Sequence, residues 1–270
     1  MYPKNDLYKV YLTTSQNGRA SSRLPDSTSR STIKMMGVAT NCCEKWDSFL
    51  DVGAGAGHYS VPLLTRFKKG TAVEATPFPE LRELAKNPRF KLFTGLFNNI
   101  TLNEQFDFIL LSDVFEHIPV DQTATFVSNL AERQASGGII YLLTPNPLFC
   151  GPAPASEIYF SKTGLGHHGH YKHYLPSEIG RIFTAKGYET IWCGYEEGRL
   201  RELVRRILYA FSSRDRRFIS SRLYRFLSAP FIALLRIFFS VAGRLVEIDE
   251  IRIRQNKLAT RTLAMILKKQ

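Results

Sequence analysis

The sequence predicts an α/β fold in which a parallel sheet carries helices on both faces. Short apolar segments with strand character alternate with segments of helical apolar spacing, which is the pattern of such a fold. The chain has 270 residues and is 44% hydrophobic, so it can bury one substantial core and still carry an insertion. Six of the expected strands centre near residues 50, 73, 92, 109, 141 and 191.

The chain begins with a polar stretch that we expect to be a flexible lead-in or lid, residues 1–33. Residues 13–32 are rich in serine and threonine and show no hydrophobic periodicity. We place the core domain at residues 34–197.

A glycine cluster joins the first expected strand to a helix, in FLDVGAGAGHYS, residues 49–60. Glycine allows sharp turns and the close approach of another molecule, so this loop predicts a nucleotide-type ligand. A dinucleotide fingerprint needs glycine at its sixth position, which here is His58, and no Gly-Lys-Ser/Thr follows as in a Walker loop. The structural alternative is a tight turn that binds nothing.

Three further motifs follow in chain order. The strand GTAVE ends in Glu74, at a spacing from the glycines that suits hydrogen bonds to ribose hydroxyls. Residues 106–119, FDFILLSDVFEHIP, form an apolar strand that runs into an acidic turn. A helix end, a turn at Gly137 and Gly138, a strand and the polar exit TPNP come next.

In this order the motifs resemble those of the class I S-adenosylmethionine-dependent methyltransferases, over most of residues 48–190. The segment DVGAGAG resembles their first motif, and 106–119 resembles their fourth-strand motif. The nearest resemblance is to small-molecule and lipid O-methyltransferases of the type 11, 12 and 23 groups. It implies a Rossmann-like sheet of seven strands with the last one antiparallel, for which TRTLAMILKK in residues 259–270 is the candidate, and S-adenosylmethionine as cofactor.

The resemblance also implies which residues bind the cofactor. One departure concerns adenine, because many relatives have an acidic residue after the third strand where this chain has Gly95, Leu96 and Phe97. We expect Leu96 or Phe97 to pack on the adenine face, or else to belong to the core. The full set is Asp51, Gly53, Ala54, Gly55, Gly57, Glu74, Ala75, Leu96, Phe97, Ser112 and Asp113.

The acceptor side is predicted from a histidine-rich loop. Methyl transfer is an in-line displacement, and a hydroxyl acceptor needs a base, for which histidine is suited. Residues 166–179, GHHGHYKHYLPSEI, hold four of the six histidines, just before a helix expected to start near Pro176. The family pattern H-x-x-x-[YF] fits His170 and Tyr174, and His117 is placed near the reacting methyl, so these three form the predicted catalytic set. The neighbouring His167, His168 and His173 are expected to be surface or loop residues.

A divalent metal is an alternative to catalysis without one. Some relatives, including ubiquinone-pathway O-methyltransferases and small-RNA end methyltransferases, hold a metal with an acid, a later Glu-His pair and a further histidine. The corresponding set here is Asp113, Glu116, His117 and His170. A metal would lower the pKa of an acceptor hydroxyl. However, the same pattern occurs in metal-free relatives, so the primary interpretation includes no metal.

Residues 198–258 are left as an insertion before the last strand, and it is strongly basic. Residues 199–244 contain eleven arginines against Glu202 and Asp215, which gives +9 of the chain's net charge of +12. Residues 199–211 have the spacing of a basic amphipathic helix. The apolar face either packs on the core, with the arginines solvated, or lies on an anionic membrane. Nucleic acid is a third, less favoured partner, because the arginines alternate with aliphatic rather than aromatic stripes.

The cysteine content and the distribution of apolar residues indicate the cellular compartment. The four cysteines have no disulfide or metal spacing, which suits a reducing cytoplasm. No secretory signal or uninterrupted membrane span is evident, because residues 226–243 are broken by Pro230 and Arg236. We therefore expect a cytoplasmic methyltransferase, peripheral to the inner membrane face, that methylates an oxygen of a small-molecule or lipid-linked acceptor. The alternatives are an RNA methyltransferase and a non-catalytic protein that binds a partner through its insertion.

Overall fold

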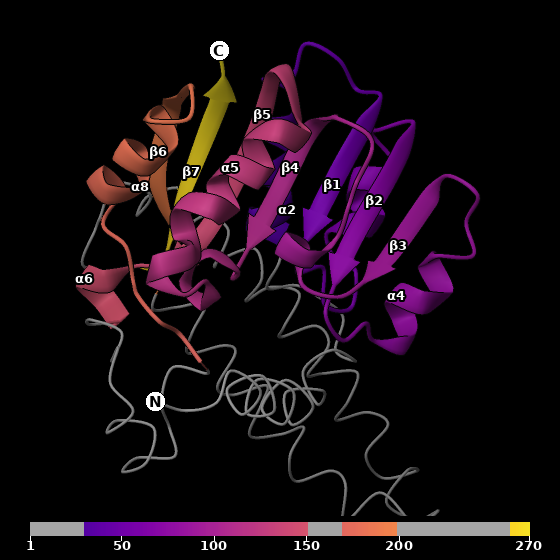
Figure 1. Ribbon diagram of the computed structural model, residues 1–270, viewed down its shortest axis with the longest axis horizontal. Helices are drawn as coiled ribbons and strands as arrows, with labels where there is room; N and C mark the ends of the chain where they lie inside the picture. The colour runs from indigo at the N-terminus through magenta and orange to yellow at the C-terminus, as the bar shows by residue number, and fades with distance from the viewer. Residues whose placement is uncertain (1–29, 151–168, 199–259) are drawn as a thin grey trace, which may run out of the picture.

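The computed structural model describes residues 30–150, 169–198 and 260–270 (Figure 1). In these residues one seven-stranded sheet has the strand order β3-β2-β1-β4-β5-β7-β6. All paired strands are parallel except those that involve β7, which runs antiparallel to both β5 and β6. This confirms the predicted sheet and its antiparallel last strand. The strands are β1 (Ser48–Val52), β2 (Lys69–Glu74), β3 (Phe90–Thr94), β4 (Phe106–Ser112), β5 (Gln134–Pro145), β6 (Tyr188–Gly198) and β7 (Thr260–Lys269).

Helices cover both faces, and α5 crosses the front of the sheet in Figure 1. One buried cluster contains residues of α2, α3 and α4, and the other contains residues of η2, α5 and α8. Three short elements, α6, η3 and η4, lie in the loops. The bounds are α2 (Arg30–Thr40), α3 (Ser60–Leu64), α4 (Pro79–Leu84), η2 (Phe97–Asn99), η3 (Phe115–His117), η4 (Val120–Gln122), α5 (Thr123–Arg133), α6 (Pro147–Cys150) and α8 (Pro176–Thr184).

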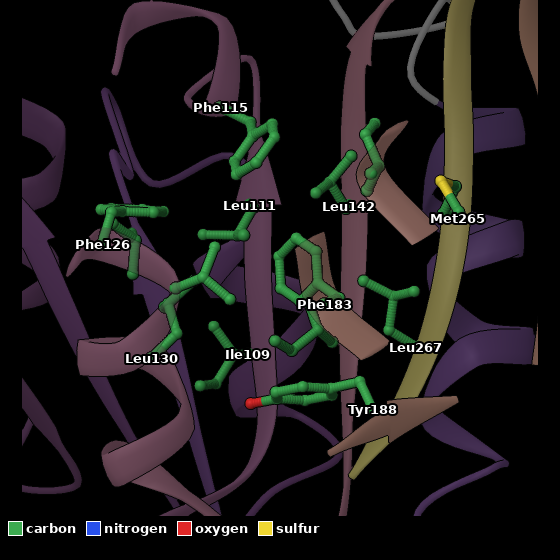
Figure 2. Close-up of a cluster of buried hydrophobic side chains, with 14 of the residues drawn as sticks. Ile109, Leu111, Phe115, Phe126, Leu130, Leu142, Phe183, Tyr188, Met265 and Leu267 are labelled. Atoms are coloured by element: carbon green, nitrogen blue, oxygen red, sulfur yellow. The ribbon is translucent and has the colours of Figure 1, made fainter. Parts of the chain in front are cut away.

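The two clusters explain why the central strands contain runs of consecutive apolar residues. Successive strand residues point to opposite faces. In β4, Ile109 and Leu111 face the α5 side, where Figure 2 shows them beside Phe126 and Leu130. Leu110 faces the α2 side instead. A strand buried on both faces needs apolar side chains on both, which produces the continuous runs seen in the sequence.

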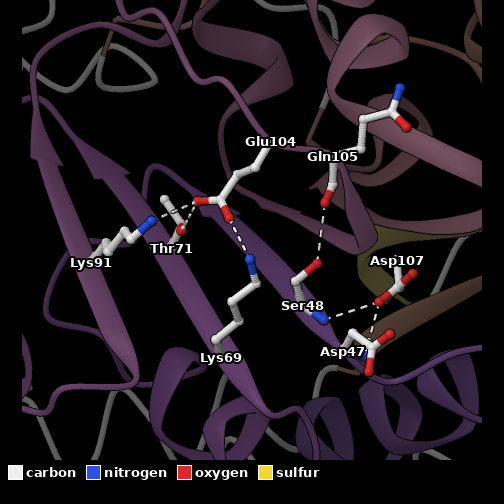
Figure 3. Close-up of polar contacts among 8 residues, drawn as sticks. All are labelled: Asp47, Ser48, Lys69, Thr71, Lys91, Glu104, Gln105 and Asp107. Atoms are coloured by element: carbon white, nitrogen blue, oxygen red, sulfur yellow. Dashed lines mark hydrogen bonds and ion pairs between the residues drawn. The ribbon is translucent and has the colours of Figure 1, made fainter.

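Polar contacts fix the amino ends of the strands (Figure 3). The carboxylate of Asp107 accepts hydrogen bonds from the backbone N–H groups of Asp47 and Ser48, both at 2.9 Å. The carboxylate of Glu104 forms an ion pair with Lys69 of β2 at 2.6 Å. These contacts align the start of β1 with β4 at the edge opposite the glycine loop.

The carboxyl ends of the six mutually parallel strands meet at one edge of the sheet. Residues 151–168 begin shortly after β5 reaches this edge. Residues 199–259 begin and end there as well, because Gly198 at the end of β6 pairs with Thr260 at the start of β7. The predicted insertion is therefore attached at the carboxyl edge, although its own structure lies outside the described residues.

Two predicted boundaries are corrected. The expected lead-in, residues 1–33, ends inside α2, which already begins at Arg30. The expected turn at Gly137 and Gly138 lies within β5, which starts at Gln134. Gly137 has φ +71°, and the β4–β5 register shifts between Phe106 and Phe108, so the glycines are part of an irregular strand.

Among the helices within the described residues, none combines the length and apolar character that crossing a membrane requires.

Candidate active site

The glycine loop after β1 adopts a backbone that other residues rarely adopt. Gly53, Gly55 and Gly57 have φ values of +72°, +55° and +80°. A Cβ atom on Gly53 would lie 2.5 Å from Val114, and one on Gly57 would lie 2.9 Å from Leu81. A Cβ atom on Gly55 would meet no described atom within 4 Å. Packing therefore requires the outer two glycines, while the middle one faces open space.

Glu74 links this loop to the end of β2. Its side chain is buried, and its Oε2 accepts a hydrogen bond from the N–H of Gly55 at 2.8 Å. Its Oε1 accepts a hydrogen bond from the N–H of Thr76 at 2.9 Å. Each carboxylate oxygen can accept more than one hydrogen bond. The structure thus brings Glu74 to the glycine loop, with Ala75 beside it in the chain.

Asp51 holds the other side of the loop. Its carboxylate is buried and accepts a hydrogen bond from the hydroxyl of Ser60 at 2.5 Å, which joins β1 to α3. Burial raises the pKa of Asp51 to about 7. The Ser60 hydrogen bond opposes this rise, and the nearby charge of Glu74 adds to it. Asp51 therefore shapes the loop, and its ionisation in this buried position lowers the stability of the fold.

The raised pKa of Asp51 predicts that the stability of the protein depends on pH. The pKa of Asp51 is higher in the folded chain than its ordinary value of 3.8, so the folded chain retains this proton up to a higher pH. The stabilising contribution is complete below about pH 4 and is lost as the pH rises through about 7. Between about pH 5 and pH 8, the wild type should lose roughly 2 to 3 kcal/mol more unfolding free energy than Asp51→Asn. Urea unfolding at both pH values measures this, and identical losses in the two proteins would contradict it.

The adenine prediction is resolved for one of its two residues. Leu96 is exposed, with 54% of its surface accessible. Phe97 is buried, and its ring packs edge-on against Phe126 with the ring centroids 5.5 Å apart. Phe97 is therefore a core residue, which is the second of the two alternatives, and Leu96 is the side chain accessible to a ligand.

The turn after β4 lies beside the glycine loop, because the side chain of Val114 would be 2.5 Å from a Cβ atom on Gly53. Ser112 ends the strand, and Asp113 has φ +55°, a conformation in which aspartate is tolerated better than most residues. The N–H of Asp113 donates to the carbonyl of Leu143 at 3.0 Å. This turn leads directly into η3, which carries the acidic and histidine residues.

Glu116 of η3 is completely buried. Its Oε2 accepts a hydrogen bond from the hydroxyl of Thr144 at 3.0 Å, while its Oε1 has no hydrogen-bond partner within the described residues. Burial, and next the charge of Asp113, raise the pKa of Glu116 well above its ordinary value. The free oxygen lies 4.0 Å from Nε2 of His170.

The histidine loop is attached to this turn at several points. The N–H of Tyr171 donates to the carbonyl of Glu116 at 2.7 Å, and Nδ1 of His117 lies 3.4 Å from the carbonyl oxygen of Gly169. The rings of His117 and His170 pack edge-on, with centroids 4.6 Å apart. The structure therefore brings His170 to Glu116 and His117, from which it is distant in sequence.

One prediction for the histidine loop is corrected. Tyr174 is buried, its hydroxyl lies 3.0 Å from the hydroxyl of Thr123, and its ring packs on Phe115 at 4.8 Å. Its hydroxyl is thus committed to the core rather than directed at an acceptor. His173 lies in the loop before α8, as expected, but its side chain is buried, with its Nε2 atom 2.8 Å from Nδ1 of His170. The other two histidines of the loop, His167 and His168, lie outside the described residues.

Sequence reasoning also missed Thr144. It lies in the segment TPNP, which was singled out only as a polar exit from the fifth strand. Its contact with Glu116 could not be read from that pattern, because Thr144 lies at the end of β5 and Glu116 lies in η3 after β4.

The metal alternative can be tested against this arrangement. Ligand atoms of Glu116, His117 and His170 lie within 4.8 Å of one another. Oε1 of Glu116, which no other described residue binds, and the imidazole nitrogens are atom types that commonly coordinate divalent ions. Three of the four predicted ligands thus fit a cation, and Asp113 does not belong to this group.

These features together define a class of protein. A seven-stranded sheet with an antiparallel β7, a glycine loop after β1, an acidic residue at the end of β2 and a polar cluster at the same edge characterise class I S-adenosylmethionine-dependent methyltransferases. Residues 20–192 match the family described as Methyltransferase domain, and the chain belongs to this family. It is therefore a methyltransferase whose cofactor is S-adenosylmethionine.

Solved structures share the fold at low sequence identity. The 1,6-didemethyltoxoflavin-N1-methyltransferase of Burkholderia thailandensis, with its substrate and S-adenosylhomocysteine bound, has a TM-score of 0.61 at 14% identity, over 100% of this chain and 92% of that one. The N-methyltransferase NodS of Bradyrhizobium japonicum, in complex with S-adenosylhomocysteine, has a TM-score of 0.54 at 12% identity, over 96% and 98%. A cyclopropane synthase of Mycobacterium tuberculosis has a TM-score of 0.55 at 14% identity, over 88% and 84%. No curated protein matches the sequence.

Proposed function

We propose that this methyltransferase transfers the methyl group of S-adenosylmethionine to an oxygen of a small-molecule or lipid-linked acceptor, with His170 as the base. The observation that carries the proposal is the cluster of Glu116, His117 and His170 beside the glycine loop. An in-line displacement requires the donor and the acceptor groups to be adjacent. The position of Val114 supports this adjacency, because Val114 lies two residues before Glu116 and would be 2.5 Å from a Cβ atom on Gly53.

The cofactor lies against the glycine loop in this proposal. Gly55 gives the backbone room to approach the cofactor, and Glu74 accepts hydrogen bonds from the ribose hydroxyls through lone pairs not used by Gly55 and Thr76. Leu96 packs on the adenine, and Asp51 shapes the loop through its hydrogen bond with Ser60. The remaining contacts come from residues of the same loops, namely Gly53, Ala54, Gly57, Ala75, Ser112 and Asp113.

His170 is the base best placed for a hydroxyl acceptor. Its Nε2 faces Oε1 of Glu116 across 4.0 Å, which is too long for a direct hydrogen bond. Because its pKa is raised, Glu116 stays protonated over a wider pH range than an ordinary glutamate. His170 is then left to take the proton of the acceptor as the C–O bond forms and the C–S bond breaks.

The loops around the cluster favour an acceptor with an apolar part. In the chain segments that follow β4, β5 and the histidine loop, three large apolar side chains are exposed: Val120 of η4, Leu148 of α6 and Leu175 just before α8. The insertion that carries +9 of the net charge is attached at this same edge. Arginines near lipid phosphates and apolar residues in the acyl boundary would bring such an acceptor to the site.

The experiment pairs acceptor detection with membrane binding. The full chain is incubated with methyl-labelled S-adenosylmethionine and, separately, with lipid and aqueous extracts of the producing organism. The proposal predicts label in an ether or ester of the lipid extract, and flotation with phosphatidylglycerol vesicles that deletion of 199–244 abolishes. Label on nitrogen or carbon would overturn the oxygen assignment. Absence of flotation, with activity retained after the deletion, would overturn the membrane role. Salt-sensitive retention on RNA with transfer of label to it would favour the RNA alternative.

A metal-assisted version is the second candidate, because Oε1 of Glu116 is buried and no other described residue forms a hydrogen bond with it. Glu116, His117 and His170 would hold the ion. A divalent ion in this place would lower the pKa of an acceptor hydroxyl and orient it. Calorimetric titration with magnesium or zinc chloride tests this. Binding to the wild type but not to Glu116→Gln would support the metal, and no binding to either would leave His170 as the base without one.

A further inference from the structure

We infer that His173 is a positioning residue that fixes the tautomer of His170 so that the Nε2 lone pair of His170 faces Glu116. The inference rests on the proposed role of His170. Its structural basis is the 2.8 Å contact between Nδ1 of His170 and Nε2 of His173.

This contact has only two arrangements when both rings are neutral. A neutral imidazole has one N–H and one lone pair, so one of the two facing nitrogens donates and the other accepts. If His173 donates, the proton of His170 lies on Nε2, on the side of Glu116. If His170 donates from Nδ1, its Nε2 presents a lone pair to that side.

Only the second arrangement serves the site. A base must have a lone pair where the acceptor proton arrives, and a metal ligand needs a lone pair at the same atom. In both cases His173 must accept the hydrogen bond from Nδ1 of His170. His173 thus acts through His170: it accepts the hydrogen bond from Nδ1 and so orients the imidazole that serves as the base.

The surroundings of His173 allow it to hold this geometry. Its side chain is buried, with 5% of its surface accessible, so the contact does not compete with bulk water. The next residue, Tyr174, is anchored by its hydroxyl contact with Thr123 and its ring contact with Phe115. On the other side, the N–H of Tyr171 is bound to the carbonyl of Glu116. The segment between these anchors cannot shift without breaking one of them.

Nitrogen NMR of the imidazole rings tests the inference without any acceptor. The wild type, labelled with ¹⁵N-histidine and assigned with His170→Gln, should show His170 protonated at Nδ1, with an unprotonated Nε2. His173→Gln should keep this state, because the amide oxygen can accept the same hydrogen bond. His173→Phe has no acceptor and should shift His170 to the Nε2–H form or to a mixture.

Two results would overturn the inference. One is a wild-type spectrum in which His170 carries its proton on Nε2, a result that does not depend on the folding of any variant. The other is a folded His173→Phe protein with an unchanged His170 tautomer. Calorimetry with S-adenosylhomocysteine checks folding, since cofactor affinity should be the same in the wild type and both variants.

Kinetics then separates this inference from the proposed function. In the assay with methyl-labelled S-adenosylmethionine and the lipid extract, His173→Phe should lower kcat by about 10- to 100-fold with little change in KM. His173→Gln should retain most of the wild-type kcat. Equal losses in both variants would indicate a merely structural role. If the tautomer is as stated but His170→Ala transfers methyl groups at the wild-type rate, the proposed function fails while the positioning of His170 stands.

Discussion

Replacing Glu74 with alanine should weaken binding of S-adenosylhomocysteine at least about 100-fold. In the proposed complex the carboxylate accepts hydrogen bonds from ribose hydroxyls, and hydrogen bonds to charged groups contribute about 1.5 to 3 kcal/mol each. Because about 1.4 kcal/mol corresponds to a tenfold change, two such bonds account for the loss. The same carboxylate holds the N–H of Gly55, so its removal also loosens the loop.

Titration calorimetry of the wild type and Glu74→Ala measures the effect. Glu83→Ala is the matched control, because it also removes a carboxylate from this part of the chain, but an exposed one that forms an ion pair with Lys86 at the surface. It should bind as the wild type does. Equal affinities for the wild type and a folded Glu74→Ala would remove Glu74 from the cofactor site.

Replacing His170 with alanine should lower methyl transfer by about 10²- to 10⁴-fold, the usual contribution of a general base. Cofactor affinity should stay within about threefold of the wild type, because no cofactor contact is assigned to His170. Transfer of label from S-adenosylmethionine to the lipid extract measures the first quantity, and calorimetry measures the second.

Tyr174→Phe is the control for this loop. It removes only the hydroxyl that contacts Thr123, inside the core. Transfer should remain near the wild-type rate, with a loss of about 1 kcal/mol in unfolding free energy. If Tyr174→Phe abolished transfer while His170→Ala did not, the roles assigned to these two residues would be reversed.

The sheet could be predicted from the sequence because its strands carry a strong local signal. β4 and β5 are buried on both faces, so nearly every residue from Phe108 to Leu111 and from Ile139 to Leu143 is apolar. The glycine loop was equally legible, since its positive φ values exclude most other residues. The antiparallel last strand came from the family resemblance, and the structure confirms it as β7.

Side-chain directions in the loops could not be predicted in this way. Phe97, His173 and Tyr174 were assigned by motif position, yet whether each faces the site or the core depends on residues far away in sequence. Phe97 packs on Phe126 of α5, and Tyr174 on Phe115 and Thr123. The hydrogen bond from Thr144 to Glu116 likewise joins two strand ends, which only the folded sheet brings together.

The cofactor lies against Gly55 in our proposal, and one pair of variants can test this placement. Gly55 and Gly187 have φ values of +55° and +81°, and a Cβ atom on either would meet no described atom within 4 Å. Alanine at each position therefore brings a similar backbone strain of about 1 to 2 kcal/mol. Gly187 lies in the turn between α8 and β6. Its backbone N–H donates a hydrogen bond to the carbonyl of Thr184, and its carbonyl accepts one from the N–H of Gln270.

Calorimetry with S-adenosylhomocysteine on Gly55→Ala and Gly187→Ala then separates strain from occupancy. We predict wild-type affinity for Gly187→Ala and an affinity at least about tenfold weaker for Gly55→Ala, because the added methyl group occupies space assigned to the cofactor. Equal affinities in the two variants would contradict the placement of the cofactor at this loop.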